Sequence, residues 1–130
     1  MRPRDLAKLL LRKAENDIAA FTKLRSDPEI AIEILGFHAQ QAAEKMLKAV
    51  LAFHQLRYPF THRITDLIDM LKDNGIFLPE KFEDARFLTP FAVELRYDFL
   101  HSEDENLDQA ATLALLQEMR EWVIAIVGVE

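Results

Sequence analysis

The residues of this chain best suited to acid–base chemistry are an arginine and a histidine separated by four residues in the segment Arg96-Tyr97-Asp98-Phe99-Leu100-His101. Arg96 offers a permanently charged fork for a phosphodiester, and His101 titrates near neutral pH as a general acid or base. Such a pair can cleave RNA without a metal. The ribose 2′-hydroxyl attacks its own phosphorus, the imidazole takes the proton, and the guanidinium stabilises charge on the phosphoryl oxygens.

The spacing of this pair limits how one copy of the chain could use it. Residues five apart on a regular α-helix point about 140° away from each other. Either the helix ends near Phe99 and His101 swings back, or a two-fold dimer brings two Arg–His pairs to one cleft. Asp98, three residues before His101, is spaced to orient the imidazole. A structural role also fits, with Arg96 paired to an acid and His101 at a helix C-terminus, where a cation is favoured.

A second candidate site is a row of polar side chains at steps of three and four along one expected helix. It contains His38, Gln41, Lys45 and Lys48, and it could bind phosphates or bases. Glu44 and Lys48, at i and i+4, also fit ordinary stabilisation of a helix surface. The following proline turn adds cations and an aromatic platform that could stack a base or cap the end of the fold. Its residues are Arg57, Tyr58, His62 and Arg63.

Several familiar kinds of catalytic site are missing from the sequence. A di-iron bundle needs two Glu-x-x-His pairs, and the nearest match is a single Asp98-x-x-His101. The chain has no cysteine, no Gly-rich phosphate loop and no Gly-x-Ser-x-Gly elbow. We therefore expect neither a metal site nor a cofactor.

The elements that must hold these residues are helices. Apolar residues recur at steps of three and four, and no stretch alternates with period two, which predicts an all-α antiparallel bundle of four to five helices. We expect helices over residues 5–25, about 28–56, 64–71, 79–99 with a break at Pro90, and 107–126, the last capped by Ser102 and Glu105. The last helix has the predicted core positions Leu107, Ala111, Leu115, Met119, Trp122 and Ile126, and further apolar residues that could meet a second copy: Leu113, Leu116, Val123 and Val127.

Length and composition predict one domain over residues 1–130, with 50% hydrophobic and 29% charged residues. The net charge of −6 divides unevenly, because residues 1–63 hold 11 basic and 7 acidic residues whereas residues 64–130 hold 5 and 15. The first half can therefore present a positive face to phosphate, or its cations can pair with acids between helices. Charges interrupt every apolar run, so we expect no membrane span. The charged residues Arg2, Arg4 and Asp5 stand where a secretion signal needs an apolar run, so we expect no targeting segment. The absence of cysteine suits a reducing compartment, and we expect a cytoplasmic protein.

Two stretches of the chain resemble the HEPN domain family (higher eukaryotes and prokaryotes nucleotide-binding). The first runs from Phe37 to Lys45 (FHAQQAAEK), with Leu47 and Lys48, the turn from Tyr58 to His62, and Asp66-Leu67. The second, from Leu88 to Tyr97, continues into Arg96 and His101, which match the family's Arg-x4-6-His motif. Together they span roughly residues 30–101.

The resemblance implies a helical bundle that forms a homodimer with its motif segments at the interface. Many relatives are metal-independent RNases of toxin–antitoxin or defence systems, often beside a minimal nucleotidyltransferase partner. It implies phosphate binding by Arg96 and proton transfer by His101. RNase-type relatives usually carry a polar residue directly after the motif arginine, where this chain has Tyr97, so a non-catalytic nucleotide-binding or partner subunit is the alternative. A purely structural dimer is a third possibility.

Overall fold

The computed structural model describes residues 1–92 and 107–128, and every regular element among them is a helix. The elements are α1 (Pro3–Leu24), α2 (Ile32–Phe53), α3 (Ile64–Asp73), the 3₁₀ helix η1 (Glu80–Phe91) and α5 (Gln109–Val127). The predicted all-helical class is therefore confirmed for these two parts of the chain. None of the described helices is both long and apolar enough to cross a membrane.

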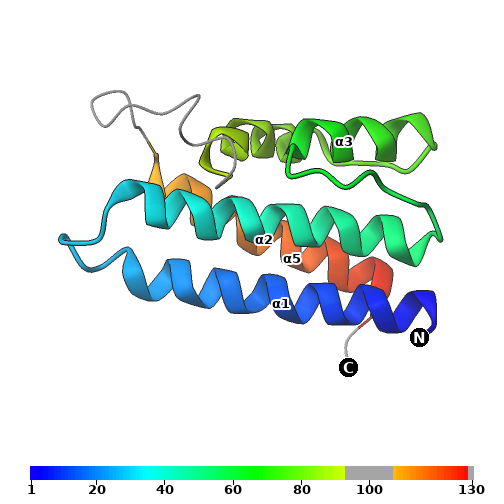
Figure 1. Cartoon of the computed structure of the whole chain (residues 1–130), viewed down its shortest axis with the longest axis horizontal. Coiled ribbons are helices and arrows are strands. Elements are labelled where there is room, and N and C mark those ends of the chain that lie inside the picture. The colour runs from blue at the N-terminus through cyan, green and yellow to red at the C-terminus, as the bar shows by residue number, and fades with distance from the viewer. Residues whose placement is uncertain (93–106, 129–130) are drawn as a thin grey trace.

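Helix α2 is the centre of the fold. It lies beside α1 and runs in the opposite direction, with α5 behind the pair and with α3 and η1 along its other side (Figure 1). Alanines at positions 39, 42, 43 and 49 are fully buried, and their small side chains let the neighbouring helices approach closely. Because α2 contacts all of these elements, its polar side chains are brought close to both α1 and the α2–α3 connection.

Both ends of α2 differ from the prediction. The helix begins at Ile32 rather than near Pro28, because Asp27 forms a turn in which its Oδ1 accepts a hydrogen bond from the Glu29 backbone N–H at 2.9 Å. It ends at Phe53 rather than Leu56, because Gln55 adopts a left-handed conformation with φ 60°. The segment Ser26-Asp27-Pro28, whose residue types are also typical of a helix start, therefore lies in the turn before the helix.

The buried face of α5 also differs from the predicted one. The helix begins after Leu107, and its N-cap is Asp108, whose side chain accepts a hydrogen bond from the Ala111 backbone N–H at 3.0 Å. Ser102 and Glu105, the predicted cap, lie outside the described residues. Of the predicted core positions only Met119 is fully buried, and the residues expected to meet a second copy lie largely inside. The buried set is Thr112, Leu116, Met119, Val123 and Val127.

A glycine on α2 allows the close approach of η1. A Cβ atom at Gly36 would overlap carbon atoms of the Phe91 ring, and that ring is itself buried. Glycine is therefore required here for packing. The contact fixes the end of η1 against the first turns of α2.

Candidate functional site

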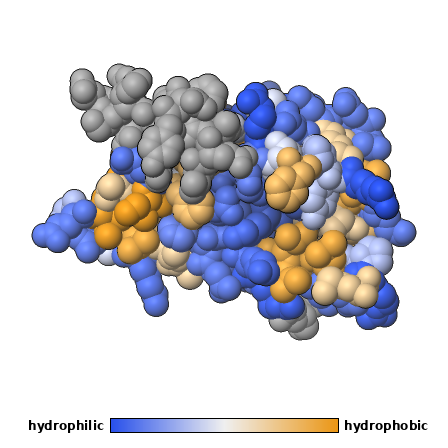
Figure 2. Space-filling model, in the orientation of Figure 1, coloured by the Kyte–Doolittle hydropathy of each residue, from blue (hydrophilic) through white to orange (hydrophobic). Residues whose placement is uncertain are grey.

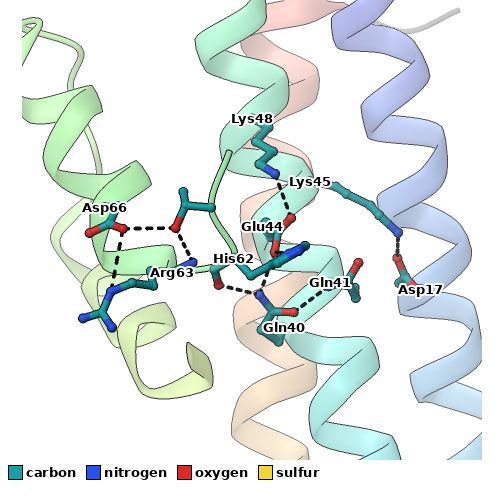
Figure 3. A network of polar contacts seen from close by, with 10 residues as sticks. Asp17, Gln40, Gln41, Glu44, Lys45, Lys48, His62, Arg63 and Asp66 are labelled. Atoms are coloured by element: carbon teal, nitrogen blue, oxygen red, sulfur yellow. Dashed lines mark hydrogen bonds and ion pairs between the residues drawn. The ribbon is translucent and has the colours of Figure 1, made fainter. Parts of the chain in front are cut away.

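Two polar side chains lie buried on α2, one turn apart. Gln40 has no exposed surface and Glu44 is 3% exposed. The Gln40 Nε2 donates hydrogen bonds to Glu44 Oε1 at 2.8 Å and to the backbone carbonyl of His62 at 3.0 Å (Figure 3). A buried polar group needs such partners, since leaving one unpaired costs about 1–3 kcal/mol. The pair therefore fixes the α2–α3 connection onto α2.

The Glu44 carboxylate is the hub of this cluster. Lys48 Nζ lies 2.9 Å from Oε2, and His62 Nδ1 lies 2.9 Å from Oε1. Burial by itself would raise the pKa of Glu44, but hydrogen bonds from Lys48, Gln40 and His62 outweigh it and hold that pKa below its ordinary value. Glu44 is therefore ionised and paired on both oxygens.

A second carboxylate ties α2 to α1. Asp17 on α1 receives Lys45 Nζ at 2.6 Å on Oδ2 and His38 Nδ1 at 3.0 Å on Oδ1. All three side chains are partly shielded, with 12% exposure for Asp17 and about a quarter for the other two. One acid of α1 thus pairs with two candidate phosphate-binding groups of α2.

The two histidines share one geometry. Each points its Nδ1 at a carboxylate oxygen, and a carboxylate only accepts hydrogen bonds. A proton on Nδ1 of each ring satisfies this contact. These contacts orient the rings, as a general base would require, and they also bind the rings to the fold.

The outer residues of the site lie on the α2–α3 connection. Arg63 Nε lies 3.7 Å from Asp66 Oδ2, and both side chains are largely exposed. Thr61 joins this group through its hydroxyl, which donates to Asp66 at 3.1 Å. Lys48 Nζ also lies 5.4 Å from the centre of the Tyr58 ring, within the range of a cation–π contact.

The predicted row on α2 is thus divided between two carboxylates. His38 and Lys45 pair with Asp17, Lys48 pairs with Glu44, and Gln41 donates to Gln40 Oε1 at 2.8 Å. A phosphate that bound the whole row would have to displace the carboxylates of Asp17 and Glu44 from these side chains. Arg96, Tyr97, Asp98 and His101 lie outside the described residues.

Three residues that organise the site were not among the predicted binding residues: Asp17, Gln40 and Glu44. The sequence holds a signal for each of them. Asp17 lies three residues after Ala14 and four before Phe21, on the buried face of α1, and Gln40 and Glu44 stand at i and i+4 within an alanine-rich helix. Polar residues at core positions need partners, and they are therefore candidates for a buried network.

The described residues contain no group of three or more His, Asp and Glu side chains that could hold a metal ion. Comparison with protein families matches the HEPN domain to residues 7–126. No curated protein and no solved structure matches the chain. The family match covers both carboxylate clusters and the segment containing Arg96 and His101.

Proposed function

Since the chain belongs to the HEPN domain family, we propose that it is a metal-independent RNase of a toxin–antitoxin or defence module. In this proposal one domain spans residues 1–130 and forms a homodimer. Arg96 binds the scissile phosphate and His101 transfers the proton. Asp98 orients the imidazole.

One observation carries the proposal. The other candidate cations of the helical row, Lys45 and Lys48, are held by carboxylates of the fold at 2.6 and 2.9 Å. A cation paired in this way attracts phosphate less than a free one does, because its charge is already compensated. This counts against the row as the phosphate-binding site, and the family match together with the Arg-x4-His motif supports Arg96 and His101 instead.

The reaction proposed is an internal transesterification. The 2′-oxygen forms a bond to phosphorus while His101 accepts its proton, and the bond from phosphorus to the 5′-oxygen breaks. A protonated His101 of the partner subunit gives the leaving 5′-oxygen its proton. The products are a 2′,3′-cyclic phosphate and a 5′-hydroxyl, and Arg96 stabilises the charge on the phosphoryl oxygens between these states.

The test is cleavage of a labelled RNA in the presence of a chelator. His101→Ala should lower the rate by about 10²- to 10⁴-fold, which is the usual contribution of a positioned acid–base group. Lys23→Ala, which removes an exposed cation in the last turn of α1, is the surface control and should cleave as wild type. Equal rates for wild type and His101→Ala, or cleavage that requires magnesium, would reject the mechanism.

The second candidate function is a nucleotide-binding or partner subunit without turnover, working with a minimal nucleotidyltransferase. Tyr97 directly after Arg96 favours it, because RNase-type relatives usually have a polar residue there. Calorimetry with a panel of nucleotides separates the two functions. Saturable binding without strand scission supports the second alone.

A further inference from the structure

A groove lies where the first turn of α1 meets the C-terminal end of α2. Its volume is about 490 Å³, and it is lined by the apolar side chains of Pro3, Leu6, Ala52 and Leu56. Figure 2 shows apolar side chains gathered over this end of α1 and α2, with hydrophilic residues around them. An apolar surface with a polar rim is typical of a site where a protein or a membrane binds.

One side of the groove is formed by the chain that leaves α2. Gln55 has φ 60°, which turns the chain away from the helix axis, and the Leu56 N–H closes this turn by donating to the Leu51 carbonyl at 3.0 Å. Leu56 and Tyr58 then line the groove together with the first turn of α1. The end of α2 at Phe53 therefore creates the groove, because a longer helix would carry these residues elsewhere.

The groove lies in line with the seam between α1 and α2. Residues 6, 10, 13 and 17 follow one another at steps of four, three and four, so they share one face of α1. Asp17 on this face meets Lys45 of α2 at 2.6 Å (Figure 3), which shows that the face borders α2. The side chains of a helix form ridges that pack into grooves of this kind, whereas a flat lipid surface does not reach into them. A third helix therefore fits the site better than a membrane.

The surroundings of the groove carry positive charge. Arg57 lines the groove, and Lys13 lies about two turns beyond Leu6 on the same face of α1. Both residues are exposed, and within residues 1–92 and 107–128 no hydrogen bond or ion pair engages either side chain. Arg2 also lines the groove, but it pairs with Asp5 at 3.1 Å. The charge that a partner would meet is therefore positive, which favours acidic side chains on that partner.

We propose that this groove docks an acidic amphipathic helix of a partner protein. The apolar stripe of that helix, with residues at i, i+3, i+4 and i+7, packs on the apolar lining of the groove. Acidic side chains beside the stripe pair with Arg57 and Lys13, which sets the orientation of the helix. This surface uses none of the residues proposed for RNA cleavage, so the proposal does not depend on that activity.

The experiment is a titration of the full chain with three synthetic peptides, followed by ¹H–¹⁵N NMR. The first peptide has leucine at helix positions i, i+3, i+4 and i+7 with glutamate on both sides of this stripe. The second replaces each glutamate by lysine, and the third keeps the composition of the first in an order that breaks the stripe. The first should shift the backbone amides of Leu6, Ala52 and Leu56 saturably. The other two should bind more weakly by about tenfold or more, because the second brings like charges together and the third lacks an apolar face.

Variants connect the shifts to the groove. Arg57→Gln and Lys13→Gln should each weaken binding of the acidic peptide by about two- to fivefold, which is the usual effect of losing an exposed ion pair. Leu6→Glu places a negative charge on the apolar lining and should remove saturable binding, while an unchanged circular dichroism spectrum shows that the variant folds. Lys23→Gln, which removes an exposed cation from the last turn of α1, is the matched control and should bind as wild type.

Three results with the peptides would overturn the proposal. They are the absence of saturable shifts at these amides with the acidic peptide at millimolar concentration, equal affinity for the peptide without the stripe, and unchanged affinity in both Arg57→Gln and Lys13→Gln. His101→Ala should bind the acidic peptide as wild type does. The docking proposal and the RNase proposal can therefore fail independently.

Other occupants of the groove give different results. Shifts of the same amides when the chain alone is concentrated would assign the groove to a second copy. Sedimentation of the chain with phosphatidylserine vesicles, lost in Arg57→Gln, would assign it to a membrane. Either result, obtained without saturable binding of the acidic peptide, would overturn the proposal.

Discussion

Replacing Glu44 with glutamine tests whether the buried carboxylate network holds the fold together. The amide keeps the shape of the side chain but removes its charge. It also replaces one acceptor oxygen by an N–H₂ group, which is a donor and cannot accept a hydrogen bond. Lys48 loses its counter-charge, and Lys48, His62 and Gln40 are left with one acceptor oxygen in place of two. The contact between α2 and the α2–α3 connection should weaken as a result.

The size of the effect follows from the burial of the partners. Removing one side of a buried ion pair costs about 3–5 kcal/mol. The Glu44 side chain is 5% exposed, but Lys48 and His62 are 14% and 32% exposed and can be partly rehydrated. We therefore expect a cost at the lower end of this range. Glu44→Gln should lower the unfolding free energy by about 3 kcal/mol, measured by urea denaturation at neutral pH.

The same network predicts a pH dependence. The pKa of Glu44 is lowered in the folded chain, so the unfolded chain binds the proton more readily. The stability from Glu44 is complete above the unfolded pKa and is lost as the pH falls through the folded pKa. The difference in unfolding free energy between wild type and Glu44→Gln should therefore shrink as the solution is made more acid.

The matched control is Glu121→Gln on α5, whose side chain is 75% exposed and lies 3.4 Å from Arg120. An exposed pair contributes little, so this variant should stay within about 0.5 kcal/mol of wild type. The reasoning is refuted if Glu44→Gln costs no more than Glu121→Gln. It also fails if the cost of Glu44→Gln does not change with pH.

Two further substitutions test the packing of α2 and its C-terminal turn. Gly36→Ala forces a Cβ into the Phe91 ring and should destabilise the fold by about 1–3 kcal/mol in urea denaturation. Gly75→Ala is the control: a Cβ there meets no neighbour, so this variant reports only the cost of a left-handed φ. Gln55→Gly relieves the left-handed strain and should raise the unfolding free energy by about 0.5–1 kcal/mol. A destabilised variant would show that the Gln55 side chain contributes more to the fold than the strain costs.

The helical class of this protein was predictable because it depends on periodicity. Steps of three and four mark each amphipathic helix wherever it packs, and α1, α2 and α3 lie close to their predicted ranges. The start of α2 was harder to predict, because the residues Asp27-Pro28 suit either the first turn of a helix or the turn before it. Asp27 forms the turn instead.

The sequence by itself determined that the chain folds into helices, that it carries an Arg-x4-His motif, and that a polar row lies along α2. Only the tertiary structure decided which side of α5 is buried, because that helix is apolar on more than one side and its neighbours select the face. The structure also decided that Asp17 and Glu44 hold the cations of the row. Ion pairing depends on which residues from distant parts of the sequence meet, and residues 17 and 45 meet only when α1 packs on α2.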